Sequence, residues 1–149
     1  MEIVYASKNF PEVNRMYYDL FEGKEPIMKF KPLENAADDS FRHEDVKLDN
    51  TITAELYVKY PLSVLVKDII TFSTLHELVS EIRRVYREIY DLEDETKTEI
   101  VKVNPQLINR GFSNGMMGIW GHTIEDLCIE EVLIFDGPER PIIQMFIGS

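Results

Sequence analysis

The sequence predicts an α+β fold: a single domain over residues 1–149 in which two helices pack on one face of a mostly antiparallel sheet. Two segments place apolar residues at helical spacing, and several shorter ones show the apolar runs typical of strands. Residues 136–140 combine Asp, Gly and Pro between the last two apolar runs, which predicts a C-terminal β-hairpin. A chain of 149 residues can bury a core without disulfides or a metal ion.

The first helix is expected over residues 9–23. Asn9 can cap its N-terminus, Glu12 stands where a capping box places the reciprocal acceptor, and Pro11 is tolerated in the first turn. Gly23 is suited to end the helix, because glycine readily adopts the left-handed conformation that follows many helices.

The second helix has the clearest local pattern, and Thr74 and Glu77 form a capping box at its start. The acidic run at residues 91–95 is expected to end it as a solvated turn, because negative charge is unfavourable at a helix C-terminus. Arg87 is expected to pair with Asp91. One apolar face follows the capping box, made of Leu75, Leu78, Val79, Ile82, Val85, Tyr86, Ile89 and Tyr90.

Two strands are expected over residues 51–60 and 62–70, separated by Pro61 because proline cannot donate a ladder hydrogen bond. Leu65 is apolar between apolar neighbours, so the second of these strands could be buried on both faces. Residues 99–103 are a weaker strand candidate, and a short helical turn could begin at Asn104 and Pro105.

The arms of the C-terminal hairpin are expected over residues 127–135 and 141–147, with an apolar face that covers the second helix. On the first arm, the residues expected on one side are Leu127, Ile129, Leu133 and Phe135. Residues 26–50 are rich in turn formers. They either contain a short strand near residues 27–30 or form a partly flexible acidic surface loop.

The net charge of -11 favours a basic protein surface as partner and disfavours direct binding to nucleic acid or to an anionic membrane. Solubility alone is the simpler explanation of this charge. A single cysteine, Cys128, excludes a disulfide within the chain and fits a reducing compartment. The N-terminal residues lack the pattern of a signal peptide, and no apolar run is long enough to span a bilayer, so a cytoplasmic location is expected.

Four of the seven glycines, Gly111, Gly115, Gly118 and Gly121, lie in one short segment. Their spacing fits neither a P-loop nor a dinucleotide-binding fingerprint. The segment could instead form a nest of backbone amides that holds an anion, with Arg110 at its mouth. The alternative is an irregular turn without a ligand.

His122 is followed closely by Glu125 and Asp126, which could form part of a metal site or an acid–base pair. His43 and His76 are the only other histidines, and no known metal-binding spacing appears, so neither a metal nor a cofactor is predicted. Hydrogen bonding of the His122 ring to the backbone is the more ordinary expectation.

The glycine-rich segment also carries a nearly contiguous apolar patch, made of Met116, Met117, Ile119 and Trp120. If exposed, such a patch suits partner binding or a homo-oligomer interface; if buried, it belongs to the core. Ser113 lies in a Gly-x-Ser-x-Gly string, but the strand before it and the helix after it that a nucleophile elbow needs are not predicted.

Acidic residues gather in three clusters, within residues 38–49, 91–99 and 125–131, and their convergence on one face would suit a basic partner. The first hypothesis is therefore a small acidic intracellular binding protein without catalytic activity, such as an inhibitor, an immunity-type factor or a nucleic-acid mimic. The alternative is a small-molecule-binding or hydrolytic enzyme with its site in residues 110–126. The candidate site residues are Arg110, Gly111, Gly115, Met116, Met117, Gly118, Trp120, Gly121, His122, Glu125 and Asp126.

Overall fold

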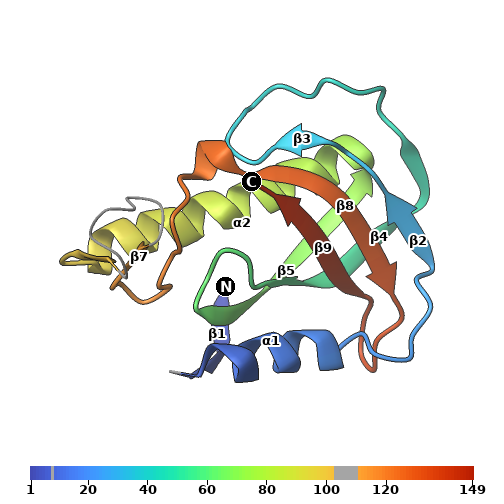
Figure 1. Cartoon of the computed structure of the whole chain (residues 1–149). Coiled ribbons are helices and arrows are strands. Elements are labelled where there is room, and N and C mark those ends of the chain that lie inside the picture. Colours follow the sequence, from blue (N-terminus) through green and yellow to red (C-terminus); the bar gives the residue numbers. More distant parts are fainter. Residues whose placement is uncertain (8, 103–110) are drawn as a thin grey trace.

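The computed structural model describes residues 1–7, 9–102 and 111–149. Its main sheet is built from β1 (Glu2–Ala6), β2 (Met28–Phe30), β3 (Glu34–Asn35), β4 (Lys47–Val58), β5 (Val64–Thr74), β8 (Cys128–Phe135) and β9 (Ile142–Gly148). Neighbouring strands follow the order β1-β5-β4-β9-β8-β2, and β3 also pairs with β8 (Figure 1). The pairing of β4 with β9 is parallel and the others are antiparallel.

A second, two-stranded sheet pairs β6 (Ile100–Lys102) with β7 (Gly111–Ser113). The strand expected at residues 99–103 is therefore confirmed, whereas the helical turn expected from Asn104 lies outside the described residues. The α+β class, the mostly antiparallel sheet and the hairpin of β8 and β9 are also confirmed.

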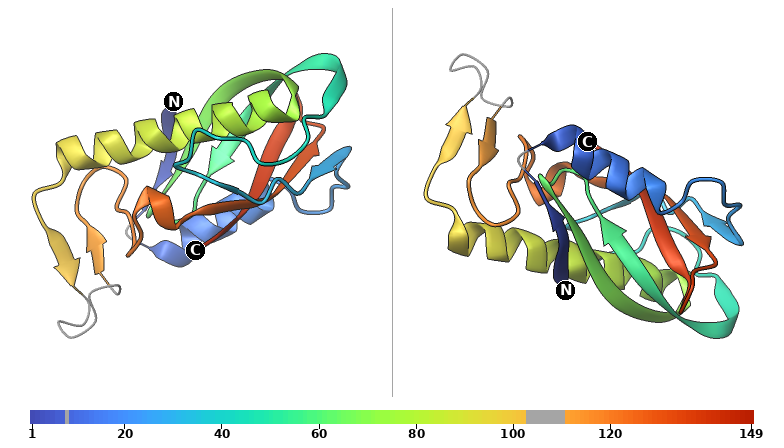
Figure 2. Two further views of the ribbon diagram at one scale, coloured as in Figure 1. Left: turned by 90° about the horizontal axis from the view of Figure 1, so that it is seen from above. Right: turned by 90° about the horizontal axis from the view of Figure 1, so that it is seen from below.

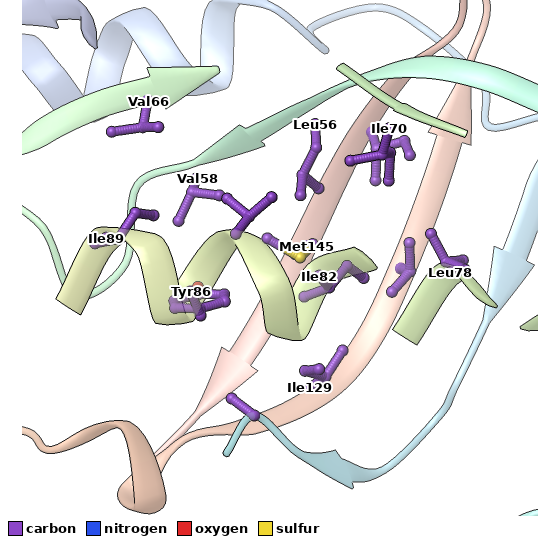
Figure 3. Packing of buried hydrophobic residues seen from close by; sticks show 14 of the residues in the cluster. Leu56, Val58, Val66, Ile70, Leu78, Ile82, Tyr86, Ile89, Ile129 and Met145 are labelled. Atoms are coloured by element: carbon purple, nitrogen blue, oxygen red, sulfur yellow. The ribbon is translucent and has the colours of Figure 1, made fainter. Parts of the chain in front are cut away.

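The two helices lie on opposite faces of the main sheet (Figure 2), which corrects the prediction that both pack on one face. Helix α2 (Leu75–Thr96) packs on the face that carries Leu56 and Val58 (Figure 3), whereas α1 (Phe10–Asp19) packs on the face that carries Tyr57. Several central strands are apolar on both faces of the sheet, so each face needs a helix to cover it. In β5, Leu65 packs with α1 while its neighbours face α2, as the sequence indicated.

Helix α1 begins as predicted after Asn9, but the side chain of Asn9 makes no capping hydrogen bond. The carboxylate of Glu12 accepts hydrogen bonds from Tyr5 and Ser7 instead, at 3.0 Å each. The helix is therefore tied to β1 and to the connection that follows it, rather than being closed by a capping box.

Helix α2 begins at the predicted cap, where the amide of Glu77 donates to the Thr74 hydroxyl at 3.1 Å. Its predicted apolar face is buried except for Tyr90, which is partly exposed. The helix runs on through the acidic run to Thr96, so the expected solvated turn at residues 91–95 is wrong. Arg87 pairs with Asp39 and not, as expected, with Asp91.

A β-bulge in β8 changes which side chains share a face. The pairing of β8 with β9 shifts between Ile129 and Glu131, and the extra residue reverses the alternation beyond it. Ile129 therefore packs toward α2, while Leu133 and Phe135 pack toward α1. The prediction that all of them lie on one side is wrong for this reason.

Residues 26–50 contain β2, β3 and the start of β4, so the short strand expected near residues 27–30 is confirmed. A buried ion pair anchors this segment to α2. The guanidinium of Arg83 donates to the carbonyls of Asn35 (2.8 Å) and Ser40 (2.7 Å) and to the carboxylate of Glu34 (3.1 Å). Both charged side chains are almost fully buried. Their polar partners offset the free energy that the two charges lose on leaving water.

The second oxygen of Glu34 accepts the Arg42 amide at 2.6 Å and lies 2.9 Å from Nδ1 of His43. Burial alone would raise the pKa of Glu34, but the Arg42 amide, His43 and the Arg83 charge together hold this pKa below its ordinary value. The carboxylate therefore stays ionised near neutral pH.

Replacing Arg83 by alanine should lower the free energy of unfolding by about 3–5 kcal/mol, because Glu34 would stay buried without its cationic partner. Arg87→Ala is the matched control, since its pair with Asp39 is exposed and should contribute less than about 1 kcal/mol. Urea unfolding at neutral pH measures both values. Similar small losses in the two variants would contradict the anchoring role of Arg83.

Candidate functional site

The glycine-rich segment folds around Glu93, in the last turn of α2. The side chain of Glu93 is 2% exposed. Its Oε1 accepts the amides of Met117 (2.8 Å) and Gly118 (3.3 Å), and its Oε2 accepts the amide of Gly115 (3.0 Å) and the hydroxyl of Ser113. A carboxylate can be buried here because four donors replace the water that it loses.

Two positions in this segment require glycine, one because of the approach to Glu93 and one because of a contact with Ser63. A Cβ on Gly115 would overlap Oε1 of Glu93 and would lie 2.7 Å from the Thr96 hydroxyl. Gly118 has φ +57°, in the left-handed region that favours glycine, and a Cβ there would lie 2.7 Å from the hydroxyl of Ser63. Gly115 therefore serves the contact with α2, and Gly118 serves the contact with Ser63.

The segment is also fixed to the connection between β4 and β5. Ser63 donates its amide to the carbonyl of Met117 (3.0 Å) and its hydroxyl to the carbonyl of Gly118 (2.7 Å). The indole of Trp120 donates to the Ser63 hydroxyl at 3.1 Å, and its ring packs against Phe112 with centroids 4.7 Å apart. The half-buried side chain of Trp120 thus helps to hold the turn against Ser63 and Phe112.

The interpretation of an amide nest open to an external anion needs correction. The nest exists, but the amides of Gly115, Met117 and Gly118 already donate to the protein's own carboxylate. An anionic ligand would have to displace Glu93, which would then be buried without partners. Arg110, expected at the mouth of the nest, lies outside the described residues.

A cleft of about 550 Å³ opens beside this segment, between the C-terminal half of α2 and residues 119–126. Known ligand pockets have volumes of about 300–1,000 Å³. Five carboxylates and two cationic side chains line the cleft, together with His122. These residues are Asp91, Glu93, Asp94, Glu125 and Asp126, with Arg87 and Lys97.

Both cations have carboxylate partners: Arg87 contacts Asp39, and Lys97 lies 2.8 Å from Asp94. Among residues 1–7, 9–102 and 111–149, neither Asp91 nor Glu125 has an ion-pair partner. The described side chains that line the cleft therefore carry a net negative charge.

Tyr90 lies in the wall of the cleft, near the charges of Asp126 and Glu125. Its hydroxyl donates to the carbonyl of His122 at 3.0 Å. Burial raises the pKa of Tyr90, and the neighbouring charges of Asp126 and Glu125 raise it further. The carboxylates of Asp126 and Glu125 thus lie close enough to Tyr90 for their charges to act on its hydroxyl.

His122 is partly exposed, and its Nδ1 lies 3.9 Å from Oδ2 of Asp126. Asp126 belongs to η2 (Ile124–Asp126), where its side chain accepts the amide of Thr123 at 3.0 Å in a capping box. The backbone of His122, rather than the expected ring, is what orders the turn, through the bond from Tyr90.

The structure places most of the predicted site residues in two groups. Those that line the cleft are Gly111, Gly121, His122, Glu125 and Asp126. Gly115, Met117 and Gly118 instead surround Glu93, with Met117 fully buried, whereas Met116 is 52% exposed. The apolar patch therefore does not form one exposed surface.

Sequence reasoning missed Glu93, Asp91 and Tyr90 as parts of the site. For Glu93 a signal was present: it follows Ile82, Tyr86 and Ile89 at the spacing of the buried face of α2. An acidic residue in register with a buried face indicates either a helix end or a satisfied buried carboxylate.

In the described part of the chain, no group of three His, Cys, Asp or Glu side chains is placed to hold a metal ion. No helix in that part is long and apolar enough to cross a membrane. No known family model, curated protein or solved structure matches this chain.

Replacing Glu93 by alanine should lower the free energy of unfolding by about 2–4 kcal/mol, because buried amides and the Ser113 hydroxyl would lose their acceptor. Asp94→Ala is the matched control: this neighbour is exposed and should cost less than about 1 kcal/mol. Urea unfolding compares the two variants. An equal effect would show that the Glu93 carboxylate does not hold the segment.

Gly118→Ala should destabilise the protein more than Gly23→Ala, although both glycines have positive φ. The strain of left-handed alanine is about 1–2 kcal/mol at either site. Gly118 adds the overlap with Ser63, whereas nothing lies within 4 Å of a Cβ on Gly23. Thermal unfolding of the two variants measures the difference, and equal melting temperatures would contradict the packing of Gly118 on Ser63.

Proposed function

We propose that this chain is a small acidic binding protein, and that the face carrying the cleft occupies a basic surface on another protein. The observation that carries the proposal is the convergence of carboxylates from distant parts of the sequence. Asp91 and Asp94 on α2 meet Glu125 and Asp126 across one cleft, and Asp39 contacts Arg87 at its edge. Members of two acidic clusters thus line one cleft, and the third is linked to it through the pair of Asp39 with Arg87.

The arrangement suits a basic partner for two physical reasons. A concave surface lined by one sign of charge focuses the field, which raises the rate of encounter with an oppositely charged surface. The glycine-rich segment also favours a basic rather than an acidic partner. Its amides already donate to Glu93, so they are not free to bind an anion. A cytoplasmic location, inferred from the single cysteine, is part of this proposal.

A second candidate, a small-molecule-binding or hydrolytic enzyme, is favoured by one observation. His122 and Asp126 are 3.9 Å apart in a cleft large enough for a small organic ligand. Ser113 is a poor nucleophile for such an enzyme, because it is buried and its hydroxyl bonds to Glu93.

Charge reversal on opposite sides of the cleft tests the first proposal. The variant Asp91→Lys with Glu125→Lys should lose a basic protein that the unaltered chain captures from its host's lysate at low salt. High salt should release the same protein from the unaltered chain, because exposed charges are screened. Mass spectrometry identifies the captured protein.

The matched control is Asp136→Lys with Glu139→Lys, in the turn between β8 and β9 at the far end of the molecule from the cleft (Figure 1). It changes the net charge by the same amount and should retain the partner. Equal loss in both variants, or retention in both, would refute binding through the cleft face.

A further inference from the structure

The inside of the cleft differs chemically from its rim. Its apolar and aromatic lining comes from α2, β6, β7 and residues 119–124, and consists of Tyr90, Ile100, Phe112, Ile119 and Ile124. Asp91, Glu125 and Asp126 stand exposed around this lining, on α2 and on η2. An occupant must therefore present apolar surface and positive charge together.

The cleft is also elongated along the helix. On this wall the lining residues extend from Arg87, on α2, to Lys97, directly after the helix, which is about 15 Å at roughly 1.5 Å per residue. An extended peptide advances about 3.3 Å per residue, so four or five residues could lie along this wall. The opposite wall, residues 119–126, is an irregular segment with a single turn of 3₁₀-helix.

A long side chain with an aliphatic stem and a cationic head matches this combination. Lysine and arginine both lay their stems on apolar surface while the charged head remains near water and carboxylates. Arginine matches better, because its planar guanidinium carries five donors that can reach acceptors on both walls and can stack on aromatic rings such as Tyr90.

We propose that the cleft takes an arginine side chain from an extended basic segment of the partner, with the guanidinium between Asp91 on α2 and Glu125 on η2. The proposal rests on the function inferred above. It specifies the feature of the partner that is bound, from a basic surface in general to an arginine in an extended segment. The anchor would be desolvated by the lining, which is how a single side chain comes to dominate an interface.

Short synthetic peptides test this directly. A flexible peptide of nine residues with one central arginine and otherwise uncharged residues is compared with versions that carry lysine, citrulline or glutamate at that position. Citrulline keeps the shape of arginine but has no charge. Fluorescence polarisation should show binding of the arginine peptide, weaker binding of the lysine peptide, and a loss of roughly tenfold or more for citrulline, because charged hydrogen bonds are lost.

Two variants of the protein locate the site. Asp91→Asn with Glu125→Gln should weaken the arginine peptide roughly tenfold or more while leaving thermal unfolding unchanged, because both side chains are exposed. Asp136→Asn with Glu139→Gln should leave the affinity unchanged. NMR shifts caused by the peptide should fall in residues 87–97 and 119–126.

Equal binding of the citrulline and arginine peptides, absence of peptide binding, or equal weakening by the two variants would overturn the arginine anchor. The proposed function fails separately: a folded basic partner that still requires Asp91 and Glu125, with no peptide bound, would refute only the anchor. A partner that ignores both carboxylates would refute the proposed function as well.

Discussion

The carboxylate of Glu93 is the contact on which the shape of the cleft depends. It draws the amides of Gly115, Met117 and Gly118 and the hydroxyl of Ser113 onto the end of α2. That contact leaves the following residues, 119–126, to form the wall that faces the helix. The buried charge of Glu93 thus fixes the position of residues 119–126 and also occupies the backbone donors of the glycine-rich segment.

Helix α2 carries a second buried charge of opposite sign, Arg83, which anchors residues 34–40 in a similar way. In both cases backbone groups of a largely irregular segment bond to a charged side chain of the helix. Irregular backbone needs such partners when it is packed against a core, because unpaired polar groups are costly to bury. Helix α2 therefore orders both residues 34–40 and the glycine-rich segment.

Local sequence patterns were enough to predict the capped start and apolar face of α2, the hairpin of β8 and β9, and the α+β class. They failed where a distant partner decides the outcome. Arg83 meets Glu34 across 49 positions of sequence, and Glu93 meets amides that follow it by more than twenty, so neither contact leaves a local pattern. The bulge in β8 likewise became evident only from its pairing with β9.

The candidate site was predicted in part for the same reason. Glycine density indicated a segment with special backbone requirements, and His122, Glu125 and Asp126 do line the cleft. The sequence left open whether the segment's donors hold an anion or form a turn without a ligand. They face Glu93, which was not considered as their partner because an acidic run at a helix end is ordinarily solvated. Charge totals could not show that carboxylates from separate clusters would meet across one cleft.

Amide hydrogen exchange tests the central role of Glu93 most directly. In the unaltered protein the amides of Met117 and Gly115 should exchange slowly, although they lie outside regular secondary structure. Glu93→Ala should accelerate these amides strongly and leave those in the middle of β5 unchanged. Fast exchange at Met117 in the unaltered protein, or no change in the variant, would contradict the account.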